Sequence, residues 1–124
     1  MGIQNRVRWS EAAPSWASIR DLLTGRGHAV QMRLVDGELC FPDQTPPDGW
    51  TELRVSIDKC MISLRREPGA FLVVAWSGAD DVMLRAWNAL TWAAAQAAGG
   101  VVEAGEGGGQ LTPSEFAAAN GIAE

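Results

Sequence analysis

The sequence contains no tyrosine, a single histidine, a single lysine and two cysteines among its 124 residues. A metal site needs several ligands at suitable spacing, and neither a Cys-x-x-Cys nor a His-x-x-x-His pattern occurs. We therefore expect no metal site, and we expect His28 to be structural or exposed. Cys40 and Cys60 fall at inward positions of predicted strands, which favours two buried thiols in a reducing compartment over a disulfide.

Catalytic signatures are also missing. The chain has no Gly-x-Ser-x-Gly elbow, no phosphate-binding loop and no dinucleotide-binding fingerprint after a strand. Asp80 and Asp81 are adjacent carboxylates, but they precede a helical run, where carboxylates typically cap the positive end. The sequence thus indicates no catalytic residue, no cofactor and no cofactor-binding residue, and it leans toward a protein that is not an enzyme.

Long apolar runs and an excess of positive charge are absent as well. No stretch approaches the roughly 18 uninterrupted apolar residues of a membrane span, and no secretory leader opens the chain. The net charge of −5 disfavours nucleic-acid backbones and anionic membranes as partners. We therefore expect a cytoplasmic protein that binds neither nucleic acid nor membranes.

The strongest strand signal is an Asp-Gly pair between two runs of alternating apolar and polar residues. Asp36 and Gly37 suit a type I′ turn, which requires positive φ at both positions. A two-residue loop pairs Leu34 with Leu39 and so puts the apolar side chains of both runs on one face. The sequence therefore predicts a hairpin over residues 30–41.

The dipeptide at 58–59 joins a second pair of alternating runs. A two-residue loop there pairs Ile57 with Cys60, but a longer loop stays open because Asp-Lys is a poorer primed turn than Asp-Gly. Residues 71–76 include no polar side chain, which is typical of a central strand covered on both sides or covered on one side with an interface on the other. About five strands are thus predicted between residues 29 and 76.

Three helices are predicted around these strands. Trp16 and Ile19 belong to a short amphipathic helix that follows Pro14. Residues 80–99 form a long helix with a wide apolar face, and the capping box at 112–115 begins a short tail helix. Shorter elements remain open: the segment before Trp9 is either an edge strand or a loose arm, and a short strand at 101–103 is one reading of the residues after the long helix.

Runs of strands bracketed by helices predict an α+β fold. We expect an antiparallel sheet of about five strands, in two hairpin or meander units, with the N-terminal helix and the long C-terminal helix packed on one face. Residues 1–104 form this domain, and residues 105–124 form a glycine-rich linker and the tail helix. The tail docks either on its own domain or on another protein.

The polar stripe of the long helix is the first candidate interface. At about 100° per residue, Arg85, Asn88 and Gln96 share one stripe, and Trp92 lies in the middle of it. An exposed tryptophan beside arginine is typical of interface hot spots. The alternative is that another segment covers Trp92 within the chain, for instance the tail helix with Phe116.

Two other surfaces are candidates. The sheet face opposite the helices is expected to carry polar side chains, and it is either a binding surface or an ordinary solvated face. Its residues are Arg33, Arg54, Ser56, Ser63 and Arg65. A pocket between sheet and helices is expected to be aromatic. Its residues are Trp16, Trp76, Met83 and Trp87.

These surfaces support two functions of different class. The first is a small non-catalytic protein-interaction or adaptor module, which binds a partner protein or a second copy of itself. The alternative is a domain that binds a small ligand in the aromatic pocket.

Overall fold

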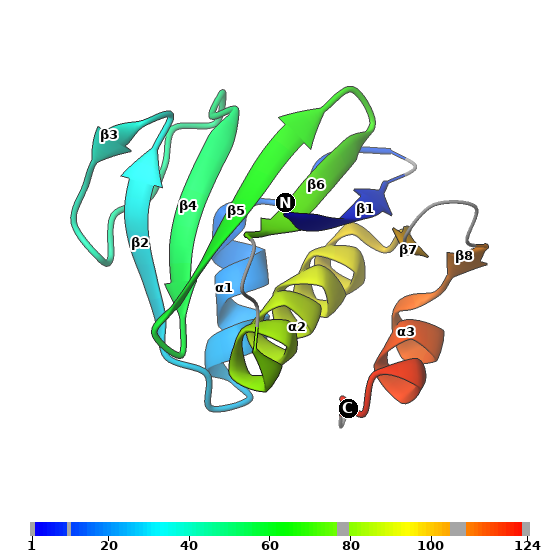
Figure 1. The fold of residues 1–124 in the computed structure, drawn as a ribbon. Helices are drawn as coiled ribbons and strands as arrows, with labels where there is room; N and C mark the ends of the chain where they lie inside the picture. The colour runs from blue at the N-terminus through cyan, green and yellow to red at the C-terminus, as the bar shows by residue number, and fades with distance from the viewer. Residues whose placement is uncertain (1, 10, 77–79, 105–108, 123–124) are drawn as a thin grey trace.

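The computed structural model describes residues 2–9, 11–76, 80–104 and 109–122 (Figure 1). Within these ranges the fold is α+β, with an antiparallel sheet and three helices. The helices are α1 (Trp16–Thr24), α2 (Asp81–Ala98) and α3 (Pro113–Ala119). The strands are β1 (Ile3–Arg8), β2 (Val30–Val35), β3 (Glu38–Leu39), β4 (Glu52–Ile57), β5 (Cys60–Glu67), β6 (Ala70–Ala75), β7 (Val101–Ala104) and β8 (Gln110–Leu111).

The sheet is larger than the sequence predicts. Its eight strands follow the order β3-β2-β4-β5-β6-β1-β7-β8, so the expectation of about five strands was wrong. The five strands between residues 29 and 76 are present, and β1, β7 and β8 extend the sheet beyond β6. β1 is an interior strand between β6 and β7. A strand's neighbours are chosen by long-range pairing, which local alternation does not report.

Both predicted hairpin turns form with two-residue loops. Asp36 and Gly37 have φ values of 50° and 84°, and Asp58 and Lys59 have φ values of 50° and 72°, so both loops have the positive φ of a type I′ turn. The pairings of Leu34 with Leu39 and of Ile57 with Cys60 are those predicted. The first hairpin is shorter than expected, because β3 contains only two residues.

The helices α1 and α2 pack together on one face of the sheet, and no described helix lies on the other face (Figure 1). The side chains between them form the core. Its largest fully buried members include Ile19 and Leu23 of α1, Leu90 and Trp92 of α2, and Leu53, Ile62 and Phe71 of the sheet. Polar contacts also cross this core; in one of them Asn5 Nδ2 donates to Thr91 Oγ1 at 3.2 Å.

The C-terminal segment packs on the rest of the chain. β8 pairs with β7, and α3 packs against α2, β7 and β8. The capping box is present, since Thr112 Oγ1 accepts from the Glu115 backbone and the Glu115 carboxylate accepts from the Thr112 backbone. Phe116 is only 2% exposed. Of the two alternatives for the tail, docking on its own domain is the one found; residues 105–108 of the expected linker lie outside the described ranges.

None of the described helices combines the length and the apolar character needed to cross a membrane.

Candidate functional site

The stripe of α2 that was the first candidate interface is largely enclosed. Trp92 is 2% exposed, and the guanidinium of Arg26 lies 4.3 Å from the centre of its ring. All of residues 91–95 are buried, so this part of α2 is covered on every side. Of the two alternatives for Trp92, coverage within its own chain is the one found. The sequence left both open because a helical wheel cannot show which stripe another element covers.

The other residues of the first candidate interface lie in different places in the structure. Arg85 and Asn88 line a cavity of about 310 Å³ between α2 and the residues that follow α1 and α3. Gln96 is exposed elsewhere on α2, and Phe116 belongs to the core. The other residues that line this cavity are Arg26, His28, Ala89, Asn120, Gly121 and Ile122.

His28 is structural as well as a cavity residue. Its Nδ1 lies 2.7 Å from Asp58 Oδ2, while Asp58 Oδ1 accepts from the Ala29 backbone at 2.9 Å. Burial raises the pKa of Asp58, but the hydrogen bonds from His28 and Ala29 and the charge of His28 outweigh it, so the pKa is lowered. These hydrogen bonds connect the residues just before β2 to the β4–β5 turn.

The residues of the expected aromatic pocket lie on opposite faces of the sheet. Trp87 packs on the helix side, where its Nε1 donates to the Val73 carbonyl at 2.8 Å. Trp76 follows β6 and is 42% exposed on the other face, with the Arg65 guanidinium 5.8 Å from its ring centre. Trp16 is 4% exposed and lines a separate cavity of about 240 Å³ near Trp50. Of the four residues, Trp76 cannot share a pocket with the others.

The sheet face without helices, here called the open face, carries the polar side chains that alternation predicts. Arg54 pairs with Ser63 and Glu52 pairs with Arg65 across β4 and β5, so these side chains share one face. Ser56 is in the same row, one pair further along.

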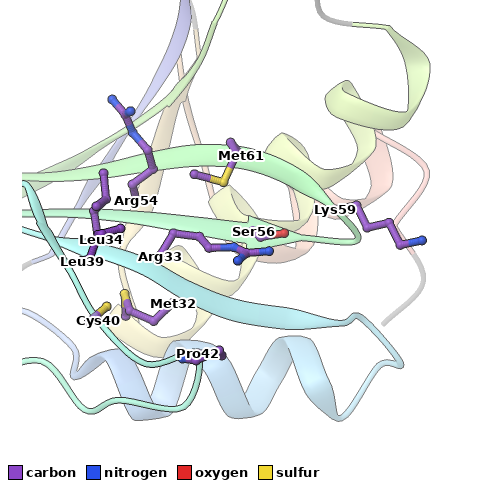
Figure 2. A pocket seen from close by; sticks show the side chains of 10 residues that line it. All are labelled: Met32, Arg33, Leu34, Leu39, Cys40, Pro42, Arg54, Ser56, Lys59 and Met61. Carbon is purple, nitrogen blue, oxygen red and sulfur yellow. The ribbon is translucent and has the colours of Figure 1, made fainter.

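A cavity of about 500 Å³ opens on this face beside β3 (Figure 2). It lies between the β2–β3 hairpin and the neighbouring strands β4 and β5. In Figure 2, Arg33 extends along the strands in the direction of Ser56, and Lys59 projects from the β4–β5 turn at one end. The residues that line the cavity are Met32, Arg33, Leu34, Leu39, Cys40, Pro42, Arg54, Ser56, Lys59 and Met61.

All charged residues that line this cavity are positively charged. The lining includes the cations Arg33, Arg54 and Lys59 and no carboxylate. None of the three forms an ion pair with another described residue. Other arginines on the open face are paired: Arg6 with Glu67 at 3.5 Å, Arg65 with Glu52 at 2.7 Å, and Arg8 with Glu103. In a chain of net charge −5, three unpaired cations around one cavity are a concentrated positive site.

Two buried polar atoms on the same face lack hydrogen-bond partners. They are Arg54 Nε and Ser63 Oγ, which belong to directly paired residues of β4 and β5. Ser63 has no exposed surface. A buried donor without a partner costs about 1–3 kcal/mol, and most buried polar groups avoid that cost. Arg54 Nε and Ser63 Oγ are therefore two neighbouring buried donors that no described residue satisfies.

Exposed apolar side chains lie in the cavity lining and next to it in the chain: Leu39 is a lining residue, and Phe41 lies between the lining residues Cys40 and Pro42. Leu39 is 90% exposed and Phe41 is 75% exposed, which makes them the most exposed large apolar residues described. The alternating pattern places Leu39 on the inward face, so sequence reasoning missed it. Leu34 and Met61 add half-buried apolar surface to the cavity wall.

The cysteines offer no reactive group. Cys40 and Cys60 are half-buried free thiols. Burial raises the pKa of the Cys40 thiol, and burial together with the carboxylates of Asp80 and Asp58 raises the pKa of the Cys60 thiol. Both thiols therefore remain protonated at neutral pH and are poor nucleophiles. Among the residues described, no three His, Cys, Asp or Glu side chains gather in a way that could hold a metal ion.

Comparisons with protein-family models, with curated proteins and with solved structures gave no match.

Proposed function

We propose that this chain is a non-catalytic protein-binding module that binds an acidic partner protein through the open face of its sheet. The observation that carries the proposal is the cavity beside β3, whose lining holds Arg33, Arg54 and Lys59 without a carboxylate. Charge complementarity assigns negative charge to the occupant, because like-charged groups brought together there would be repelled.

The apolar border of the cavity supports a macromolecular partner. Leu39 and Phe41 project from the edge of the sheet with 90% and 75% of their surface exposed. Apolar anchors beside arginine are typical of interface hot spots, whereas a small ion would leave both side chains in water. The Trp76–Arg65 pair lies further along the open face and extends the surface available to a partner.

A second copy of the chain fits this face poorly. A symmetric dimer buries the same patch of both subunits against itself, which would bring two sets of Arg33, Arg54 and Lys59 together. Edge-to-edge pairing is also disfavoured, because the edge strands β3 and β8 have only two residues each. We therefore commit to a different protein as the occupant.

The test begins with affinity capture and purification of the captured protein, followed by binding measurements on the reconstituted complex by calorimetry. The double variant Leu39→Ser/Phe41→Ser should bind at least about tenfold more weakly, as expected for loss of anchor contacts. Val82→Ser is the matched control, because Val82 is 46% exposed on α2, on the helix side of the sheet. Equal loss in the control, or unchanged binding by the double variant, contradicts the proposal.

A second candidate function is binding of a small anion in the cavity between α1, α2 and α3. Arg26, His28 and Arg85 line that cavity, and no carboxylate does. The charge favours an anionic ligand rather than an apolar or cationic one. A rise in melting temperature with citrate or phosphate that is absent in Arg85→Gln would support this candidate, and no rise with either anion would dismiss it.

A further inference from the structure

We propose that Arg54 is the recognition residue of the open face and that it binds a carboxylate side chain of the partner inside the cavity beside β3. This inference rests on the proposed function and names the chemistry of its central contact.

The Arg54 side chain has unpaired hydrogen-bond donors. No described residue accepts a hydrogen bond from the Arg54 side chain, and its Nε is buried. Arginine presents its donors as a planar fork that matches the two oxygens of a carboxylate. Ser63 Oγ, from the directly paired residue of β5, is a further donor without a partner. A carboxylate in the cavity would be an acceptor for Arg54, which lines it. Ser63 has no exposed surface and is not a lining residue, so the carboxylate reaches its hydroxyl only if the Arg54 side chain moves aside.

The surroundings strengthen such an ion pair. Leu34 and Met61 line the cavity beside Arg54, and Leu39, which is 90% exposed, is free to close over an entering group. Apolar walls lower the local dielectric constant, so the attraction between opposite charges is larger there than in water. Arg33 and Lys59 add positive charge at the same cavity, which favours an acidic segment with several carboxylates.

The size of the site fits a side chain with its neighbours. The cavity volume is about 500 Å³, within the range of roughly 300–1,000 Å³ usual for ligand sites. The exposed Leu39 lines it, and Phe41 lies between the lining residues Cys40 and Pro42 in the chain, so a peptide whose acidic side chain enters has apolar side chains to contact nearby. The site therefore suits an acidic peptide segment with adjacent apolar residues, not a free anion.

The experiment follows the arginine side-chain Hε–Nε resonances of the full chain by NMR. The probe is a capped hexapeptide with four glutamates and two leucines, and its counterpart carries glutamine at the four acidic positions. We expect the Arg54 Nε resonance to shift and saturate with the acidic peptide and to stay unchanged with the glutamine peptide. Inorganic phosphate, added separately, should leave it unchanged.

Variants assign the contact. Arg54→Lys keeps the charge but removes the fork, so the acidic peptide should bind at least tenfold more weakly. Ser63→Ala should weaken it by a few-fold. Arg20→Gln is the control, because Arg20 lies on α1 and pairs with Asp21 at 3.1 Å. Amide spectra establish whether each variant is folded. If Arg54→Lys does not fold, the Arg54 resonance of the wild type and the affinity of Ser63→Ala still test the carboxylate contact.

The outcomes separate this inference from the proposed function. The inference is overturned if the Arg54 resonance does not respond, if the glutamine peptide shifts it equally, or if phosphate alone shifts it. If the purified partner loses affinity with Leu39→Ser/Phe41→Ser but not with Arg54→Lys, the open face is the interface and the carboxylate contact is wrong. If neither variant weakens the partner, both proposals fail.

Discussion

Leu34 pairs with Arg54, not with Leu53, because β2 carries a bulge between Met32 and Leu34. Met32 still pairs with Val55 on the core face, so the extra residue moves Leu34 to the open face and lets Val35 pair with Leu53. A shift of one residue exchanges the two faces of a strand. The bulge therefore takes Leu34 and its hairpin partner Leu39 out of the core and makes them a wall of the cavity.

The bulge predicts that two leucines on paired strands contribute unequally to stability. Leu53 has no exposed surface, whereas Leu34 is half-buried on the open face. Leu53→Ala should lower the free energy of unfolding by about 2–5 kcal/mol, the usual range for a buried leucine. Leu34→Ala should cost less than about 1 kcal/mol, since little core surface is lost. Urea denaturation measures both, and equal losses would place Leu34 in the core.

Several features of the fold could be predicted because their signals are local. Asp36-Gly37 specifies a type I′ turn by itself, and Asp58-Lys59 forms one although its composition is less favourable. The polar face shared by Arg54 and Ser63 followed from alternation alone. Each of these depends on residues close together in the chain.

The features that were missed depend on long-range pairing or on small deviations. No glycine marks the bulge at Arg33. The alternating pattern was therefore extended through this position, and Leu34 was predicted to lie in the core. β1 has neighbours about 65 and 95 residues away in the chain, which no local pattern specifies. Trp92 falls on a polar stripe, yet α1 and the residues after it approach that stripe in the fold.

Trp92 and Trp76 were both predicted as binding-site residues, but their replacement by alanine should lower the stability to different extents. Trp92→Ala should cost about 3–5 kcal/mol of unfolding free energy, because a buried aromatic side chain leaves a large cavity. Trp76→Ala should cost about 1 kcal/mol or less, since Trp76 is 42% exposed. Thermal and urea denaturation provide the values. A small effect at Trp92 would contradict its burial between the helices.

Asp36 predicts a pH dependence of stability. Hydrogen bonds from the Thr51 hydroxyl and from the backbones of Glu52 and Thr51 hold the pKa of Asp36 below its ordinary value of 3.8. The folded state therefore favours the charged carboxylate, so the contribution is complete above the ordinary pKa and is lost as pH falls through the lowered one. Asp36→Asn should be less stable by about 1 kcal/mol at neutral pH.

The measurement for Asp36 is urea denaturation of both proteins at neutral pH and at about pH 2, below the ordinary carboxylate pKa. The difference between wild type and Asp36→Asn should narrow at the lower pH, because the wild-type carboxylate is then increasingly protonated. Glu11→Gln is the control, since Glu11 is exposed and forms no hydrogen bond with a described residue. A difference that stays constant with pH would assign the loss to geometry rather than to charge.

Substitution of Ser63 by alanine should raise the stability of the free chain and lower its affinity for the acidic partner. The Ser63 hydroxyl is buried without a partner in the free chain, so Ser63→Ala removes an unsatisfied group and should raise the free energy of unfolding by about 1 kcal/mol. Ser56→Ala is the matched control, because Ser56 is on the same face and lines the cavity, and its hydroxyl is not among the buried unpartnered atoms. The stability of Ser56→Ala should change by less than about 0.5 kcal/mol.

A stabilised Ser63→Ala that binds the acidic partner more weakly would show that the partner supplies the hydrogen-bond acceptor of the Ser63 hydroxyl. A destabilised one would show that the hydroxyl is satisfied within the free chain.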